Sequence, residues 1–172
     1  MLEITNNIQT DRLFNNLRDL FQSSKYSELG IILSSIHGLS LLHHSHHWKT
    51  KGTIFFSDHL LFERLYTSVE EDFDGIAERI LGLDDQGGAE MVDMTKILSG
   101  AYKFNKLIKE YAFSDDCAVI SLEAEKFFLD CLEVCMDSLE QKGLLSRGLE
   151  QMLGNIADKH EGLIYLLKQR IK

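Results

Sequence analysis

Apolar residues recur along most of this chain at intervals of three and four, the spacing that is typical of amphipathic α-helices. Four long segments carry this pattern, and a shorter one lies between the second and the third. The sequence therefore predicts helices over about residues 24–50, 54–81, 91–111, 114–142 and 146–171. This order favours an all-α fold, a four-helix bundle with a short extra helix in the crossover between the second and third long helices.

Polar residues and glycines between the apolar segments predict where the helices begin and end. Thr53 is expected to be the N-cap of the second long helix, and Ser114 to be that of the third. The clearest turn is at residues 84–88, where two Asp and two Gly residues occur together. A break is expected within the short helix near Ser99-Gly100.

The composition agrees with this fold, and the net charge indicates which kinds of partner the protein can bind. The 172 residues include no Pro and are 44% hydrophobic, which suits a single domain (residues 1–172) with a sizeable core. The formal net charge of −9 disfavours nucleic acid and anionic membranes as partners and attracts cations. The chain lacks a transmembrane segment, and its first seven residues lack a secretory signal, so we expect a cytoplasmic protein.

Imidazole and carboxylate groups are the main candidates for chemistry. Four of them lie on the second long helix: His59, Glu63, Asp74 and Glu78. At 100° per residue, with the first as origin, the other three fall at roughly 40°, 60° and 100°. The four side chains therefore form one stripe, and His47 lies just before this helix. Each alone is typical of a solvated surface, but together they make a ligand set that suits iron and related divalent metals.

The length of the helix decides how such a site must be built. Glu63 and Asp74 are 11 residues apart in the sequence, which separates them by roughly 16 Å along the helix axis. Two metals in one site lie only about 3.5–4 Å apart, so one copy of the helix cannot supply all the ligands. Two antiparallel copies about a two-fold axis can, because the His59 end of one then faces the Asp74 end of the other. The spacing predicts metal sites between subunits.

The segments around these ligands resemble motifs of the Dps family of mini-ferritins, which are ferritin-like proteins. Residues 47–55, HWKTKGTIF, match the pattern H-W-x-x-x-G-x-x-F, and His59 follows 12 residues after the first His. Residues 74–79, DGIAER, match D-x-x-A-E-R. The likeness is strong over about residues 29–83, and the DKH segment at residues 158–160 also resembles some members.

This resemblance implies an iron-oxidising and iron-storing protein that protects against oxidative damage. By it, His47, His59 and Glu63 of one subunit bind iron (Fe2+/Fe3+) together with Asp74 and Glu78 of the two-fold partner. Such a ferroxidase, an oxidoreductase, uses hydrogen peroxide or oxygen and stores ferric mineral inside a hollow homo-dodecamer. The family more often has Asp at the position of Glu63, and the extra methylene changes the reach of this carboxylate.

Other histidines, the tryptophan and the cysteines are interpreted structurally. His43 is expected to pack in the dimer contact, His44 and His46 are expected to be exposed, and His160 has no partner at ligand spacing. Trp48 is expected to be a core aromatic at a helix corner or, by analogy with the family, a trap for oxidising equivalents. The cysteines lack metal-binding spacing and are predicted to be reduced packing residues: Cys117, Cys131 and Cys135.

Three alternative functions fit the sequence less well. A ferritin-like di-iron site inside one subunit requires Glu-x-x-His pairs, and no His here follows an acidic residue at that spacing. A DNA-compacting Dps-like bundle without significant ferroxidase activity requires a basic tail, whereas Arg12 is the only base in the first 12 residues; we expect weak or no DNA binding. A catalytically silent bundle is disfavoured because all five ligand types are present.

Overall fold

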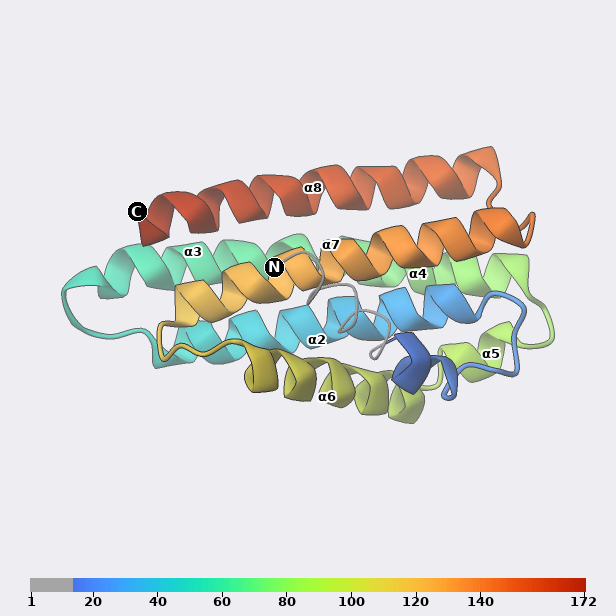
Figure 1. The fold of residues 1–172 in the computed structure, drawn as a ribbon, viewed down its shortest axis with the longest axis horizontal. Coiled ribbons are helices and arrows are strands. Elements are labelled where there is room, and N and C mark those ends of the chain that lie inside the picture. Colours follow the sequence, from blue (N-terminus) through green and yellow to red (C-terminus); the bar gives the residue numbers. More distant parts are fainter. Residues whose placement is uncertain (1–13) are drawn as a thin grey trace.

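The computed structural model describes residues 14–172, and its regular elements in this range are all helical. Helices α2, α7 and α8 and the rod formed by α3 and α4 lie alongside one another as a four-helix bundle (Figure 1). The bounds are α2 Ser27–Lys49, the 3-10 helix η1 Gly52–Ile54, α3 Phe55–Ser68, α4 Glu70–Leu83, α5 Gly88–Met91, α6 Met94–Tyr111, α7 Cys117–Gln141 and α8 Arg147–Ile171. The predicted fold class is confirmed, and α5 and α6 form the crossover.

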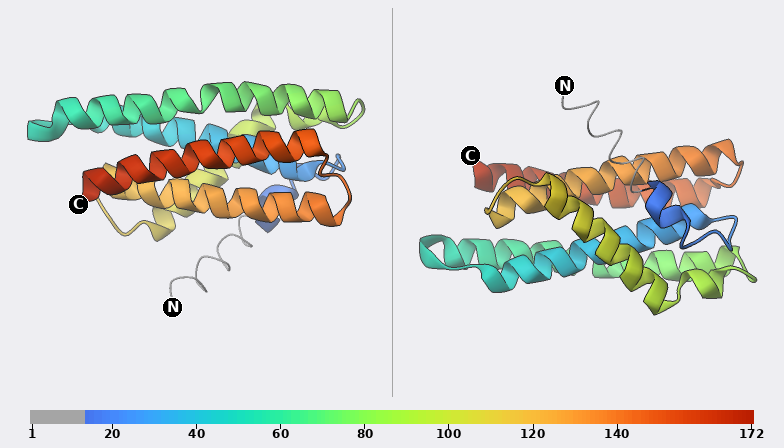
Figure 2. Two further views of the ribbon diagram at one scale, coloured as in Figure 1. Left: turned by 90° about the horizontal axis from the view of Figure 1, so that it is seen from above. Right: turned by 60° about the horizontal axis from the view of Figure 1, so that its bottom comes forward.

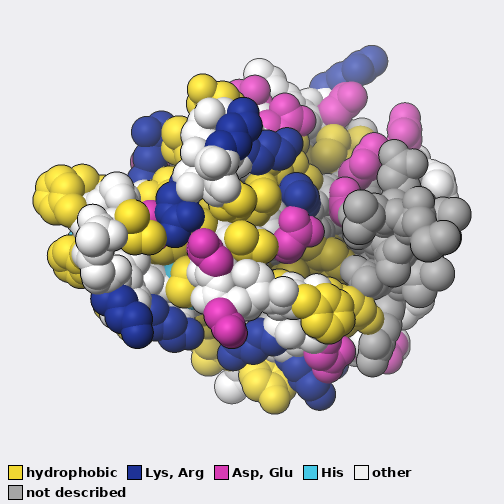
Figure 3. Space-filling view, turned by 60° about the vertical axis from the view of Figure 1, so that its left-hand side comes forward, with side chains coloured by type: hydrophobic (Ala, Val, Ile, Leu, Met, Phe, Trp, Pro, Cys, Tyr) yellow, Lys and Arg dark blue, Asp and Glu magenta, His cyan; other side chains and the backbone are white. Residues whose placement is uncertain are grey.

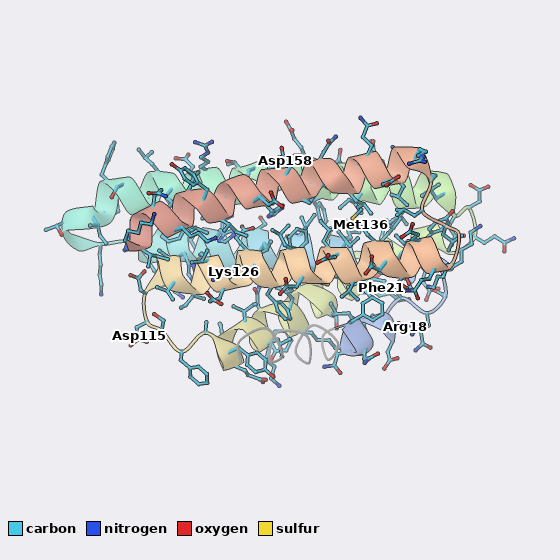
Figure 4. The ribbon with its side chains drawn as sticks, turned by 45° about the horizontal axis from the view of Figure 1, so that its top comes forward. Arg18, Phe21, Asp115, Lys126, Met136 and Asp158 are labelled. Carbon is cyan, nitrogen blue, oxygen red and sulfur yellow. The ribbon has the colours of Figure 1, made fainter. Side chains whose placement is uncertain are left out.

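Helix α2 lies at the centre of the molecule and packs against α3, α4, α6 and α7. Its residues 27–36 are all buried, as expected for a helix surrounded by others. The main core includes the predicted packing residues Cys131 and Cys135, and Met136 of α7 packs against it (Figure 4). A second, smaller cluster joins α3 to α7 and α8: Phe62, Leu65, Ala118, Leu122, Leu163, Ile164 and Leu167. This second cluster holds the middle of α3 against α7 and α8.

Helix α6 crosses α2 obliquely on the outside of the bundle (Figure 2, right). Two glycines allow the close approach. A Cβ on Gly38 would lie 2.9 Å from the side chain of Phe104, and a Cβ on Gly100 would lie 2.6 Å from Cβ of Ser34. The glycine at position 100 is therefore required by packing between α2 and α6, and it does not break α6, contrary to the prediction.

The close approach of α6 to α2 gives a test of the packing. Gly100→Ala should lower the free energy of unfolding by about 1–3 kcal/mol, because the new methyl group overlaps Ser34. Gly154→Ala is the matched control on α8, where a Cβ would meet nothing within 4 Å; it should stabilise the protein by up to about 1 kcal/mol through helix propensity. Urea unfolding monitored by circular dichroism measures both, and equal effects would contradict the packing argument.

Two of the predicted N-caps are wrong. Thr53 lies inside η1, and α3 begins after it without a side-chain cap. Ser114 does not cap α7. The cap is Asp116, whose Oδ1 accepts a hydrogen bond from the N–H of Ala118 at 2.8 Å. Ser114 instead accepts from the N–H of Asp116 at 3.1 Å and shapes the turn before the helix. A carboxylate makes a stronger, charge-assisted bond to a helix N-terminus than a hydroxyl does.

The second long helix, predicted as continuous, is interrupted at Val69. Nζ of Lys159 on α8 donates to the carbonyl of Ser68 at 3.1 Å and pairs with Oδ1 of Asp72 at 2.8 Å. A side chain that inserts into the hydrogen-bond ladder interrupts a helix without Pro or Gly, so Lys159 accounts for the break. Helices α3 and α4 still continue in nearly one direction (Figure 2, left). Within residues 14–172, no helix combines the length and apolarity needed to cross a membrane.

Candidate metal centre

His47, near the end of α2, and His59, in the first turns of α3, lie against each other. Nδ1 of His47 is 2.9 Å from the carbonyl oxygen of His59, and Nδ1 of His59 is 3.3 Å from that of His47. The two rings stack with centroids 3.6 Å apart. Because a carbonyl can only accept, each Nδ1 carries a proton, and in the neutral imidazole Nε2 then keeps a lone pair. This tautomer is the one in which Nε2 binds a metal.

The tight connection between α2 and α3 makes this contact possible. Gly52 has a φ of +79°, a left-handed conformation that glycine adopts without strain. The hydroxyl of Thr50 donates to the carbonyl of His47 at 2.8 Å and closes the end of α2. The chain therefore reverses direction within a few residues, and α3 returns along α2 with His59 beside His47.

The three predicted acidic ligands are all exposed: Glu63, Asp74 and Glu78. The first is one turn beyond His59 on α3, whereas the other two lie on α4, beyond the interruption at Val69. In the part of the chain that the structure describes, no three His, Cys, Asp or Glu side chains come together in a metal-binding arrangement. One copy thus brings the two histidines together but does not bring the acids of α4 to them.

Exposed apolar side chains lie close in sequence to the histidine pair, and Phe55 stacks on His59 with ring centroids 4.9 Å apart. Trp48 is 74% exposed and Phe56 is 73% exposed, so the prediction of Trp48 as a core residue is wrong. His44 was predicted to be exposed, but it is half-buried and stacks on Tyr66 with ring centroids 3.8 Å apart. Figure 3 shows hydrophobic side chains at this projecting end of the bundle, and further exposed ones are Ile54, Phe55 and Leu60. Apolar surface of this kind is typical of an interaction site.

Sequence reasoning missed a buried polar cluster in the bundle interior. Glu125 of α7 accepts hydrogen bonds from Nε2 of His43 at 2.7 Å and from Nδ1 of His160 at 2.5 Å. Oγ of Ser121 lies 3.1 Å from Nδ1 of His43 and 2.8 Å from Nδ1 of His46. All five side chains are buried. His43 is therefore a core residue rather than a dimer contact, and the prediction that His46 is exposed is wrong. His160 has a carboxylate partner on α7 that no spacing in the sequence indicates.

The charges in this buried cluster follow from its contacts. Burial alone raises the pKa of Glu125, but the charge and hydrogen bonds of His160 and His43 outweigh it and lower that pKa to about 2. Burial, assisted by the neighbouring His43 and Lys49, lowers the pKa of His46 to about 3. At neutral pH this cluster therefore holds an ionised Glu125 and a neutral His46. The helical spacing of the sequence carried no signal for this cluster, because its members come from three helices.

Comparison with known proteins supports the predicted resemblance. No protein-family model matches the chain. It is 43% identical over 56 residues to "DNA protection during starvation protein 2" of Bacillus anthracis, and this stretch covers 33% of this chain and 38% of that protein. It is 46% identical over 50 residues to "Antigen TpF1" of Treponema pallidum, and this stretch covers 29% of this chain and 28% of that protein. The matched stretches thus span well under half the length of these relatives.

Solved structures resemble the chain over nearly its whole length. The Dps protein of Vibrio cholerae O1, described as a member of a broad superfamily of ferritin-like diiron-carboxylate proteins, matches with a TM-score of 0.66, 21% identity, and coverage of 96% of this chain and 92% of that one. Dps from Thermosynechococcus elongatus matches with a TM-score of 0.68, 18% identity, and coverage of 95% and 94%. The ferritin-like bundle and the likeness to Dps proteins are confirmed.

Proposed function

We propose that this chain is a mini-ferritin of the Dps type, a cytoplasmic ferroxidase that oxidises Fe(II) at sites shared by two subunits and stores the ferric product inside a hollow oligomer. The observation that carries the proposal is the pair His47 and His59. Each ring is held by the backbone carbonyl of the other residue, and each Nε2 is left able to bind iron. A fold similar to that of Dps proteins supports it.

The remaining ligands come from a second copy in this proposal. Antiparallel pairing of two α3–α4 rods about a two-fold axis places the acids of α4 opposite the histidines of the partner. The exposed apolar residues around the pair favour such an arrangement, because the second copy would cover them. Each complete site would then hold His47, His59 and Glu63 of one subunit with Asp74 and Glu78 of the other.

The chemistry of oxidation follows from the charges at such a site. Carboxylates attract Fe(III) more strongly than Fe(II), because the attraction scales with the charge of the metal, and oxidation becomes more favourable. Two Fe(II) ions give up two electrons, which with two protons reduce one hydrogen peroxide to two water molecules. The paired transfer avoids the one-electron step that releases hydroxyl radical, and oxygen is the alternative oxidant. The net charge of −9 favours iron over DNA as a partner.

A complementation experiment tests whether the protein oxidises Fe(II) and whether each metal site takes its ligands from two subunits. His59→Ala and Asp74→Ala should each lower the rate of Fe(II) oxidation by peroxide at least about tenfold. When both variants are expressed together, a mixed dimer contains one site with both ligands intact, so random pairing should restore about one quarter of the wild-type rate. Absorbance of the ferric product measures the rate, and Glu70→Ala, an exposed acid on α4, is the control.

The outcomes separate the alternatives. Full activity in both single variants would overturn the ferroxidase proposal. Loss in both, with no recovery in particles shown by mass spectrometry to contain both chains, would place the ligands within one subunit and overturn the shared site.

A further inference from the structure

The beginning of α3, which carries His59, has few anchors of its own. The helix starts without a side-chain cap, and residues 51–57 before and within its first turn are all exposed. The first buried side chain in this stretch is Asp58, which is 6% exposed and directly precedes His59. Unsatisfied N–H groups make an uncapped helix start prone to fraying. The placement of His59 therefore depends on what holds Asp58, in addition to the contact with His47.

Arg170, in the last turn of α8, holds Asp58 with two hydrogen bonds. Nε of Arg170 is 2.8 Å from Oδ1 of Asp58, and a terminal nitrogen, Nη2, is 3.0 Å from Oδ2. The other terminal nitrogen, Nη1, lies 3.4 Å from Oδ2 of Asp116, the N-cap of α7. Bidentate bonds between guanidinium and carboxylate are strong and fix orientation. One side chain thus joins the ends of α3, α7 and α8.

The surroundings of this contact show that it is partly shielded from solvent. The side chain of Asp58 is 8% exposed and that of Arg170 is 23% exposed. Lys and Arg side chains lie beside Asp and Glu on this end of the bundle (Figure 3). The apolar cluster that includes Phe62 and Leu167 supports α3 and α8 one turn further in. The pair of Asp58 and Arg170 therefore ties the first turn of α3, next to His59, to the end of α8.

We propose that Arg170 is a positioning residue for the metal centre: by holding Asp58, it fixes the first turn of α3 so that His59 meets His47. This inference rests on the proposed function, since it assigns Arg170 a role at the same site. The hydrogen bond between Nδ1 of His59 and the carbonyl of His47 is the longer of the two reciprocal bonds, at 3.3 Å. The histidine on α3 is thus the less tightly held of the pair, and it is the one that Arg170 secures.

A metal titration of the full-length protein tests the role of Arg170. Co(II) is the probe, under conditions without oxidant, because its visible absorption reports the ligands that it acquires. Arg170→Gln and Asp58→Asn should each weaken Co(II) binding by about 10–100-fold. The double variant should bind no more weakly than either single one, because both changes remove the same contact. Lys168→Gln, in the same last turn and with the same change in charge, is the matched control and should leave binding unchanged.

Two further measurements separate positioning from general loss of structure. Circular dichroism at the temperature of the titration must show a folded helical protein; if Arg170→Gln fails this, the isosteric Asp58→Asn carries the test. At saturating Co(II), both variants should regain the wild-type absorption spectrum, because the ligands themselves are intact.

His59→Ala distinguishes failure of this inference from failure of the proposed function. Unchanged Co(II) binding in His59→Ala would overturn the proposed function. If His59→Ala loses binding whereas Arg170→Gln binds like the wild type, only the role of Arg170 is overturned. Additive losses in the double variant would likewise contradict a shared contact.

Discussion

Glu125→Ala is expected to lower the free energy of unfolding by about 3–5 kcal/mol, since it removes one partner from a buried charged cluster. The carboxylate accepts hydrogen bonds from His43 on α2 and His160 on α8. Without it, two buried ring N–H groups lose their acceptor, and each unsatisfied group costs about 1–3 kcal/mol. Glu125 also connects three helices of the bundle, so its loss removes contacts that no neighbouring side chain replaces.

Glu123→Ala on the same helix is the matched control for Glu125→Ala. Glu123 forms a surface ion pair with Lys126 at 2.8 Å, and its side chain is 48% exposed. Such a pair contributes only about 0–1 kcal/mol. Chemical unfolding of both variants at pH 7, followed by circular dichroism, gives the comparison. If Glu125→Ala is as stable as Glu123→Ala, the buried cluster does not hold the bundle together.

The protein is expected to lose stability in acid in two stages. The pKa of His46 is lowered by burial from its ordinary 6.5 to about 3 in the folded chain. Between these values the unfolded chain binds the additional proton, so the stability contributed by neutral His46 is lost as pH falls through this window. The pKa of Glu125 is lowered from 4.5 to about 2, so its contribution is lost as pH falls below 4.5. The decline should begin below 6.5 and steepen below 4.5.

Urea unfolding at several pH values between about 7.5 and 3.5 measures this decline, which should reach a few kcal/mol. Burial also lowers the pKa of His37, which adds to the loss in the same direction. His46→Gln should reduce the first stage, leaving the contribution of His37, and should leave the second stage unchanged. An unchanged slope between pH 6.5 and 4.5 in that variant would show that His46 is not the group responsible. Glu123→Ala serves again as the control and should leave both stages in place.

Local patterns in the sequence were sufficient to predict the helices. Apolar spacing reports which face of a helix is buried, and it predicted four long helices and an extra one in the crossover. The separation of Glu63 and Asp74 on one rod was also readable, because the rise per residue of a helix is constant. The helix ends were predicted less accurately. The N-cap of α7 is Asp116 and not Ser114. The second long helix is interrupted at Val69, where Lys159 donates to the carbonyl of Ser68.

Which distant side chains are in contact depends on how the helices pack against one another. His43 and Glu125 are 82 residues apart in the sequence, and Asp58 and Arg170 are 112 apart. From the spacing of apolar residues alone, such polar residues would be assigned to the solvent-exposed face of a helix. The spacing shows which face of its own helix a residue occupies, but it does not show which helix packs against that face. The contact of His47 with His59 likewise required the tight reversal through Gly52. Residue spacing thus predicted the helices and the candidate ligands, whereas packing between helices determined which groups are buried, which are charged and which are in contact.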